Sequence, residues 1–295
     1  MKKIIFILIF NLLIIPAIAK GAILYLDPDS ANYYEGDTFI VKLKIETEGE
    51  CINVVDLKLN FPKDVLEAVG FSEADSILSV WLKRPEIRQD QGLISLTGGI
   101  PGGFCGKLLG ELGEVNLLGK AAFKVKHQDV RTVSLNFSES HVLLNDGVGT
   151  EAPLELKGAV LSVLSGIVKE PKEEWQAELK ADVFPPEVVR IEVSREDSLF
   201  DGKYFIVFSS TDKQTGIDHF EVKEGILPWK TAVSPYLLEN QGLQSIIRVK
   251  AVDRAGNERI SEWRVASRNV SWWFLILVLL GLFLWTIYTR FLKKK

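Results

Sequence analysis

The stretch VDLKLNF, Val55 to Phe61, alternates apolar and polar residues with a period of two. In an extended strand, its apolar residues would lie on one face and its polar residues on the other. The segment FIVKLKIE, Phe39 to Glu46, shows the same alternation just upstream. This pattern is typical of an antiparallel sheet with one face on a core and one in water. We therefore predict β-strands here, with Asp56 on a solvent-facing side.

Similar short runs continue along the chain and indicate an all-β fold. They lie at residues 93–97, 121–126, 132–137 and 154–164. Polar turn residues such as Asn145-Asp146-Gly147 separate them. Many short strands joined by polar turns are typical of a β-sandwich. We predict that a first sandwich occupies residues 20–165.

The alternation stops in a charged segment that contains several prolines, residues 166–187. Pro185-Pro186 favours an extended backbone, and only residues 173–180 have the composition of a brief helix. We predict that this segment is a linker. Alternation then resumes and finishes beside a turn at Asp253 to Asn257, which predicts a smaller second sandwich over residues 188–268.

The N-terminus has the pattern of a secretory signal peptide. Lys2-Lys3 precedes an apolar run from Ile4 to Ile15, and Ala17-Ile18-Ala19 offers the small residues that a signal peptidase accepts. We predict a signal peptide over residues 1–19. An uncleaved N-terminal anchor is the alternative, and both interpretations export the residues that follow.

A second apolar segment, WWFLILVLLGLFLWTIYT from Trp272 to Thr289, contains no charge. Its length is close to the roughly 20 residues that cross a bilayer as a helix. Its aromatic edges fit the headgroup region, and the basic residues after it favour the cytoplasmic side. We predict one transmembrane helix over 270–292, a cytoplasmic tail over 293–295, and an extracellular N-terminal ectodomain at the cell membrane. A buried core helix is the alternative.

The composition and the motifs argue against nucleic-acid binding and enzymatic chemistry. A formal net charge of -4 offers no basic footprint for nucleic acid. The three histidines lie outside an H-E-x-x-H spacing, and no G-x-S-x-G sequence occurs. We expect no catalytic residues, no cofactor and no metal. Calcium ligands could come from Asp27 and Asp29 or from Asn145 and Asp146, but neither pair has the D-x-[DN]-x-[DN]-G spacing, and turn roles explain both.

The chain has two cysteines, Cys51 and Cys105. Cys105 lies in the glycine-rich segment GGIPGGFCGK, Gly98 to Lys107, which fails the phosphate-loop pattern because Leu108 stands where Ser or Thr is required. Since an exported protein can be oxidised, we expect a disulfide between Cys51 and Cys105. Two separate thiols are the alternative. We interpret the segment as a rim loop beside the strand that carries Asp56.

Several segments occur in the order and spacing of a cohesin domain. They are DTFIVKLKIETEG, DLKLNFPKDVLEAVGF, GLISLTGG, GKAAFKVK and LNFSESHVLLNDGVGTE. The span from Gly21 to Ser165 resembles a cohesin-type module over its full length. The resemblance implies a jelly roll related to carbohydrate-binding modules, which in cellulosome scaffolds captures dockerin domains. The second sandwich resembles the Ig-like or fibronectin-like repeats of bacterial surface proteins.

The resemblance also implies where a partner would bind. Asp56 matches the aspartate of an Asn-x-Asp pair on the third cohesin strand, whereas Val54 replaces the asparagine. An acidic position at the end of the sixth strand falls near Gly98 or Gly99. The candidate binding residues are Asp56, Lys58, Ser95 and Thr97.

We expect a membrane-anchored cell-surface binding or adhesion protein whose cohesin-like module recognises an extracellular protein or a polysaccharide. One alternative is a structural cell-envelope protein without a soluble ligand, and another is a dedicated carbohydrate-binding protein. Trp81, Trp175 and Trp229 are the candidates for stacking on sugar rings. We expect each of them to be structural, because Trp81 lies in an apolar run, Trp175 in the linker and Trp229 between strands.

Overall fold

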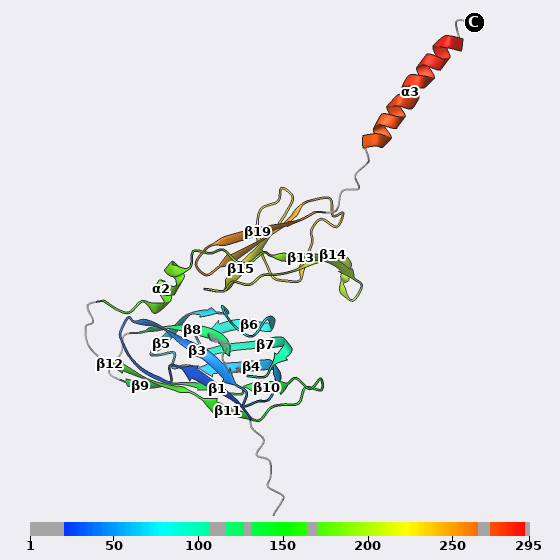
Figure 1. Ribbon diagram of the computed structural model, residues 1–295. Helices are drawn as coiled ribbons and strands as arrows, with labels where there is room; N and C mark the ends of the chain where they lie inside the picture. Colours follow the sequence, from blue (N-terminus) through cyan, green and yellow to red (C-terminus); the bar gives the residue numbers. More distant parts are fainter. Residues whose placement is uncertain (1–20, 107–115, 127–130, 165–169, 265–271, 293–295) are drawn as a thin grey trace, which may run out of the picture. The chain divides into compact units, whose positions relative to one another are not determined.

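The computed structural model describes residues 21–106, 116–126, 131–164, 170–264 and 272–292. Strands dominate this part of the chain, which confirms the predicted β-rich fold (Figure 1). The chain forms two compact units. The first comprises Met1–Val189, Ser209–Phe220 and Lys250–Arg259, and the second comprises Arg190–Phe208, Glu221–Val249 and Ile260–Lys295.

Two sheets make up the first sandwich. One has the order β11-β1-β3-β8-β5, and the other has the order β2-β12-β9-β4-β7-β6, with β10 paired to β4. The strands of the first sheet are β1 (Ala22–Asp27), β3 (Thr38–Glu46), β5 (Leu66–Ser72), β8 (Leu117–Val125) and β11 (Leu154–Lys157). Those of the second are β2 (Ser30–Tyr34), β4 (Ile52–Asn60), β6 (Val80–Arg88), β7 (Leu93–Phe104), β9 (Arg131–Phe137), β10 (His141–Leu144) and β12 (Ala159–Leu164).

The core of this sandwich is built from the alternating residues seen in the sequence. In β3, the side chains of Phe39, Val41, Leu43 and Ile45 are all fully buried. Residues from both sheets form one apolar cluster. Within it, the ring of Phe123 lies 5.7 Å from that of Phe39. The predicted alternation of core and solvent positions is therefore confirmed.

Strand β7 extends further than the sequence indicated. Gly98 and Gly99, expected in a rim loop, pair with Val55 and Val54 of β4, and the strand continues to Phe104. A Cβ atom added at Gly98 would lie 2.9 Å from Leu78, so glycine permits the close approach of that side chain. The glycine-rich segment is therefore largely a strand end, and a loop only beyond it.

Part of the segment predicted as a linker packs on the first sheet. The brief helix expected at 173–180 is α2 (Glu174–Ala181), and Trp175 within it is only 5% exposed. A Cβ atom added at Gly70 of β5 would lie 2.7 Å from the Trp175 ring, which shows how closely the indole packs on this strand. An indole of this size gives a short helix a strong hydrophobic anchor.

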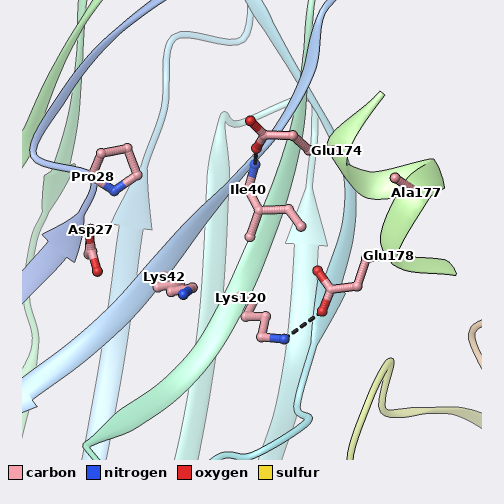
Figure 2. Close-up of a pocket in the computed structure, with 8 residues that line it drawn as sticks. All are labelled: Asp27, Pro28, Ile40, Lys42, Lys120, Glu174, Ala177 and Glu178. Atoms are coloured by element: carbon pink, nitrogen blue, oxygen red, sulfur yellow. Dashed lines mark hydrogen bonds and ion pairs between the residues drawn. The ribbon is translucent and has the colours of Figure 1, made fainter. Parts of the chain in front are cut away.

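Hydrogen bonds and an ion pair also hold α2 on the sheet. Glu174 accepts a hydrogen bond from the Ile40 backbone nitrogen at 3.1 Å, and Glu178 pairs with Lys120 of β8 (Figure 2). The Thr38 hydroxyl donates to Gln176 at 2.7 Å. The helix is thus part of the first sandwich.

Seven strands follow α2 and form two further sheets. One has the order β13-β14-β17, and the other has the order β16-β15-β18-β19. The alternation predicted for this segment is confirmed in β18, where every second residue is buried. The strands are β13 (Arg190–Glu196), β14 (Leu199–Ser209), β15 (Ile217–Glu224), β16 (Lys230–Ala232), β17 (Tyr236–Leu237), β18 (Ile247–Asp253) and β19 (Glu258–Trp263).

The C-terminal apolar segment is the helix α3 (Trp272–Leu292). Its described side chains, at residues 276–286, are exposed. Among the described residues, no helix is long and apolar enough to cross a membrane. The predicted segment is thus helical, and its passage through a membrane stays a prediction. The predicted signal peptide, 1–19, and tail, 293–295, lie outside the described residues.

Candidate binding face

The pairing of β4 with β7 brings the four predicted binding residues together. Asp56 lies opposite Thr97, and Lys58 lies opposite Ser95. Residues directly opposite each other in an antiparallel pair project to the same side of the sheet. The Thr97 hydroxyl donates a hydrogen bond of 2.8 Å to the Asp56 carboxylate. The four residues therefore form two adjacent rows on one face.

Strands β6 and β10 extend these rows on either side. Lys83 of β6 lies opposite Thr97, Glu86 of β6 lies opposite Ser95, and His141 of β10 lies opposite Asp56. Val54 lies one row further along β4. We define the binding face as Val54, Asp56, Lys58, Lys83, Glu86, Ser95, Thr97 and His141.

The sequence did not reveal the contribution of β6 or β10. The register of β6 against β7 shifts twice, between Trp81 and Lys83 and between Lys83 and Glu86. Such irregularities interrupt the period-two signal, and Pro85 weakens it further. Strand β10 has only four residues, too few to show a period. The resemblance to cohesins pointed to β4 and β7 alone.

The charged side chains of Lys58, Lys83 and Glu86 on the binding face form ion pairs, either with each other or with residues at its border. Glu86 forms ion pairs with Arg88 at 2.8 Å and Lys83 at 3.1 Å. Hydrogen bonds from Arg88 and then from Lys83 lower the pKa of Glu86 to about 2. Lys58 pairs in turn with Glu139. A partner would therefore meet a face whose positive and negative groups are already close to balance.

Ser95 has a supporting role within this face. Its side chain is buried, and its hydroxyl accepts a hydrogen bond of 2.9 Å from the Lys83 ammonium. The other three predicted residues, Asp56, Lys58 and Thr97, are partly exposed. Ser95 thus positions Lys83, while a partner would contact its neighbours.

An apolar border lies at one end of the face. Val80 of β6 and Val54 of β4 both lie opposite Gly99 of β7, which has no side chain to place between them. The Val80 side chain is 50% exposed. The border offers an apolar contact next to the polar rows.

The predicted disulfide fixes the chain beside this border. Cys51 and Cys105 are bonded to each other, which confirms the expectation. The Asn145 backbone nitrogen donates to the Cys51 carbonyl oxygen at 2.8 Å, and its side-chain amide donates to the Gly102 carbonyl oxygen at 3.1 Å. Together these contacts hold the ends of β4 and β7 at the edge of the binding face.

His141 is the titratable group on this face with a charge that changes near neutral pH. Its Nδ1 lies 2.6 Å from a carboxylate oxygen of Glu151. The hydrogen bond to Glu151 is the main cause that raises the pKa of His141 above its ordinary value, and the negative charge of Asp56 adds to it. Lys58 acts in the opposite direction.

We predict that replacing Glu151 with glutamine lowers the pKa of His141. In the wild type, the stabilising interaction of charged His141 is complete below pH 6.5, its unfolded pKa, and is lost as pH rises through its higher folded pKa. Glu151→Gln replaces the carboxylate that makes this hydrogen bond with a neutral amide and removes its negative charge. A pH titration of the histidine ring signals by NMR measures the change, with the His219 signals as an internal reference. An unchanged titration of His141 would contradict this account.

The carboxylates considered as calcium ligands have other partners. Asp27 forms an ion pair of 2.6 Å with Lys44. Asp29 accepts a hydrogen bond from Ser30. Asp146 accepts hydrogen bonds from the backbone nitrogens of Val148 and Gly149, as expected for a turn residue.

The sequence analysis missed a cluster of three aspartates, because these residues are far apart in the sequence. Among the described residues, Asp182, Asp212 and Asp253 place ligand atoms within 4.8 Å of one another. Burial raises the pKa of Asp253, and the other two charges add to this. Protein donors surround the group, including the Thr215 hydroxyl 2.6 Å from Asp182 and the Asn257 amide 3.0 Å from Asp253.

An open groove of about 510 Å³ lies between α2 and the strands β1, β3 and β8 (Figure 2). Its charged groups are occupied in local contacts. Glu178 pairs with Lys120, Asp27 pairs with Lys44, and Glu174 accepts from the backbone of Ile40. The charged groups that line the groove therefore hold α2 on the sheet or pair with neighbouring side chains.

The three tryptophans considered for sugar stacking have structural contacts. Trp81 packs against the core of the first sandwich, and Trp175 is buried between α2 and the sheet. Trp229 is partly buried, with the Lys223 ammonium 5.9 Å from its ring centre. The structural roles expected for Trp81 and Trp175 are confirmed.

No family model and no curated protein matches the chain. Solved structures similar to part of it include a non-cellulosomal cohesin from the hyperthermophilic archaeon Archaeoglobus fulgidus. That match has 18% identity and a TM-score of 0.37, and covers 49% of this chain and 91% of that one. The seventh ScaB type I cohesin from Pseudobacteroides cellulosolvens matches with 18% identity and a TM-score of 0.40, over 52% of this chain and 99% of that one.

A type I cohesin–dockerin complex from Clostridium thermocellum matches with 13% identity and a TM-score of 0.38. The match covers 48% of this chain and 92% of that one. The similar structures are thus cohesin modules, and each matches about half of this chain.

Proposed function

We propose that this chain is a surface-tethered binding protein whose first sandwich recognises a folded protein through the binding face. The observation that carries the proposal is the hydrogen-bonded pair of Asp56 and Thr97, at the centre of an ordered sheet face. Paired charges and an apolar border surround it. The protein has the role of an adhesion or capture module, and binds without catalysing a reaction.

The chemistry of the face favours a protein over a glycan. Protein interfaces combine an apolar contact region with a polar surround whose hydrogen bonds fix the register. The border of Val54 and Val80 supplies the apolar contact region, and the rows around Asp56 supply the polar surround. Sugar rings are held by exposed aromatic faces, whereas Trp81 and Trp175 are used in packing.

The cohesin-like sequence segments support the same face as the contact surface. The substitution by Val54, and a glycine, Gly98 or Gly99, near the acidic position, set it apart from the cohesin pattern. A suitable partner would place an apolar side chain over the border and a hydrogen-bond donor near Asp56. Such a partner is a dockerin-like or other extracellular protein, and its contact residues would differ from those that recognise an Asn-x-Asp pair.

We further propose that export and anchoring place this face outside the cell. The lysine-led apolar run at residues 1–19 supports export, and the uncharged, aromatic-edged segment of α3 supports a membrane anchor. The second sandwich, Ig-like by its sequence segments, then serves as a spacer between the anchor and the binding module.

Site-specific photo-crosslinking from the face tests the proposal. A benzoylphenylalanine replaces Thr97 in one variant and Thr132, an exposed threonine on β9, in the matched control. The full chain in lipid nanodiscs is illuminated with the secreted and surface proteins of the producing organism. We expect a protein that is captured from position 97 and not from position 132.

Three results would contradict the proposal. One is equal capture of proteins from both positions. Another is retention of polysaccharide, and of no protein, by the wild-type chain, which would favour a carbohydrate-binding role. The third is crosslinking of position 97 only to other copies of this chain, which would favour a structural envelope role.

A further inference from the structure

An exposed apolar turn follows β15 in the second unit. It has the sequence ILPW, Ile226 to Trp229, and begins after Gly225, whose φ of 59° lies in the left-handed region. The Ile226 side chain is 100% exposed, and Leu227 is 39% exposed. Single exposed aliphatic residues are common on soluble proteins. Four consecutive apolar residues that end in tryptophan on an outward turn are a different case, since contiguous apolar surface marks an interaction site.

Hydrogen bonds place this turn at one particular end of its sheet. The Gly225 backbone nitrogen donates to the Ile246 carbonyl oxygen at 2.8 Å, so the turn lies beside the start of β18. Arg248, two residues further along, forms an ion pair of 2.6 Å with Glu262 of β19. The turn therefore lies at the end of the sheet where β19 finishes at Trp263.

The same end of the sheet leads to the apolar helix. Residues 264–271 separate Trp263 from the first residue of α3. Even when fully extended, a segment of this length spans at most roughly 30 Å. A bilayer that receives α3 therefore lies within this reach of Trp263, at the end of the sheet that carries the exposed turn.

The turn also has the chemistry of a bilayer interface. Tryptophan is enriched at the headgroup level, where its ring and its N–H meet different surroundings. The Lys223 ammonium lies over the Trp229 ring and could meet lipid phosphates while the apolar residues enter the acyl region. Ile226 and Leu227 are the exposed aliphatic residues of the turn. Their side chains would enter the acyl region.

We propose that the Ile226 to Trp229 turn inserts into the phospholipid surface of the membrane that α3 enters. This inference rests on the proposed membrane anchoring. Insertion gives the second sandwich a second attachment point, since it fixes one end of the sheet at the bilayer. The binding module would then be presented on a stem that is held at two places.

Three single-cysteine variants of the full chain test the inference. Ile226→Cys reports on the turn. Lys213→Cys, 78% exposed and before the start of β15, is the control, about 25 Å from the turn along the strand. Gly281→Cys lies within α3 and reports on the anchor. The only natural cysteines form the disulfide, so an environment-sensitive fluorophore labels the new thiol alone under non-reducing conditions.

Each labelled protein is reconstituted into phosphatidylcholine vesicles with and without brominated acyl chains, which quench fluorophores inside the bilayer. We expect brominated lipid to remove most of the emission at positions 226 and 281 and to leave that at 213 unchanged. If brominated lipid leaves the emission at position 226 unchanged, as at position 213, while it quenches the emission at position 281, the inference is overturned and the anchor stands. Failure of quenching at 281, or of the protein to float with the vesicles, would overturn the anchoring itself and the inference with it.

Discussion

Replacing Trp175 with alanine is expected to destabilise the first sandwich by about 3–5 kcal/mol, the usual cost of removing a large aromatic side chain from a core. The indole is 5% exposed and packs against Gly70 of β5. Without it, the helix loses its large buried side chain, and its polar contacts to Thr38, Ile40 and Lys120 remain. These contacts are partly exposed and cannot replace the lost apolar burial.

Native-state hydrogen exchange is the appropriate measurement because it reports each unit separately. Strand β8 pairs with both β3 and β5. In Trp175→Ala, the free energy of opening measured at the β8 amides should fall by about 3–5 kcal/mol. Trp229→Ala is the matched control, since Trp229 lies outside the first sandwich and its loss should leave those amides unchanged. Equal protection of β8 in the wild type and in Trp175→Ala would show that α2 is a passive linker.

Removing the disulfide is expected to have an effect of similar size. In the chain-entropy model, a bond across a sequence separation of 54 residues stabilises the folded protein by about 4 kcal/mol. Cys105 is exposed and Cys51 partly so, which means that little apolar burial is lost with the sulfur atoms. The closed loop contains β4, β5, β6 and β7, three of which carry binding-face residues, so the binding face depends on it.

The double variant Cys51→Ala/Cys105→Ala should show this loss in the exchange of β4 and β7 amides. Reduced wild-type protein is the control and should match the variant, and intact mass verifies that the bond is broken. A variant as stable as the oxidised wild type would contradict the prediction. The disulfide would then have no stabilising role in this fold.

The sequence supported predictions wherever one local pattern decided the structure. Alternation in β3 and β4 fixed which side chains enter the core, because a strand has only two faces. The position of Asp56 and Thr97 on adjacent strands followed from the same rule once the cohesin-like order was recognised. The two cysteines left a single possible intramolecular pairing for an exported chain.

The remaining features depend on contacts that no local pattern encodes. Trp175 was expected in a linker because an eight-residue helix carries no signal of the surface on which it docks. His141 joins the face only through the pairing of β10 with β4. Asp182 and Asp253 meet because the fold brings distant segments together. The alternation places Ser95 on the polar face, yet its side chain is buried, with its hydroxyl hydrogen-bonded to Lys83.

The affinity of the crosslinked partner for two arginine variants tests the central claim most directly. Thr97→Arg places a long charged side chain at the centre of the binding face and removes the hydrogen bond to Asp56, whereas Thr132→Arg makes the same change on β9. Isothermal titration of the full chain measures both dissociation constants. Loss of a central contact costs about 2 kcal/mol or more, so Thr97→Arg should weaken binding on the order of 30-fold or more, with Thr132→Arg close to wild type. Equal affinities for the two variants would contradict the assignment of this face.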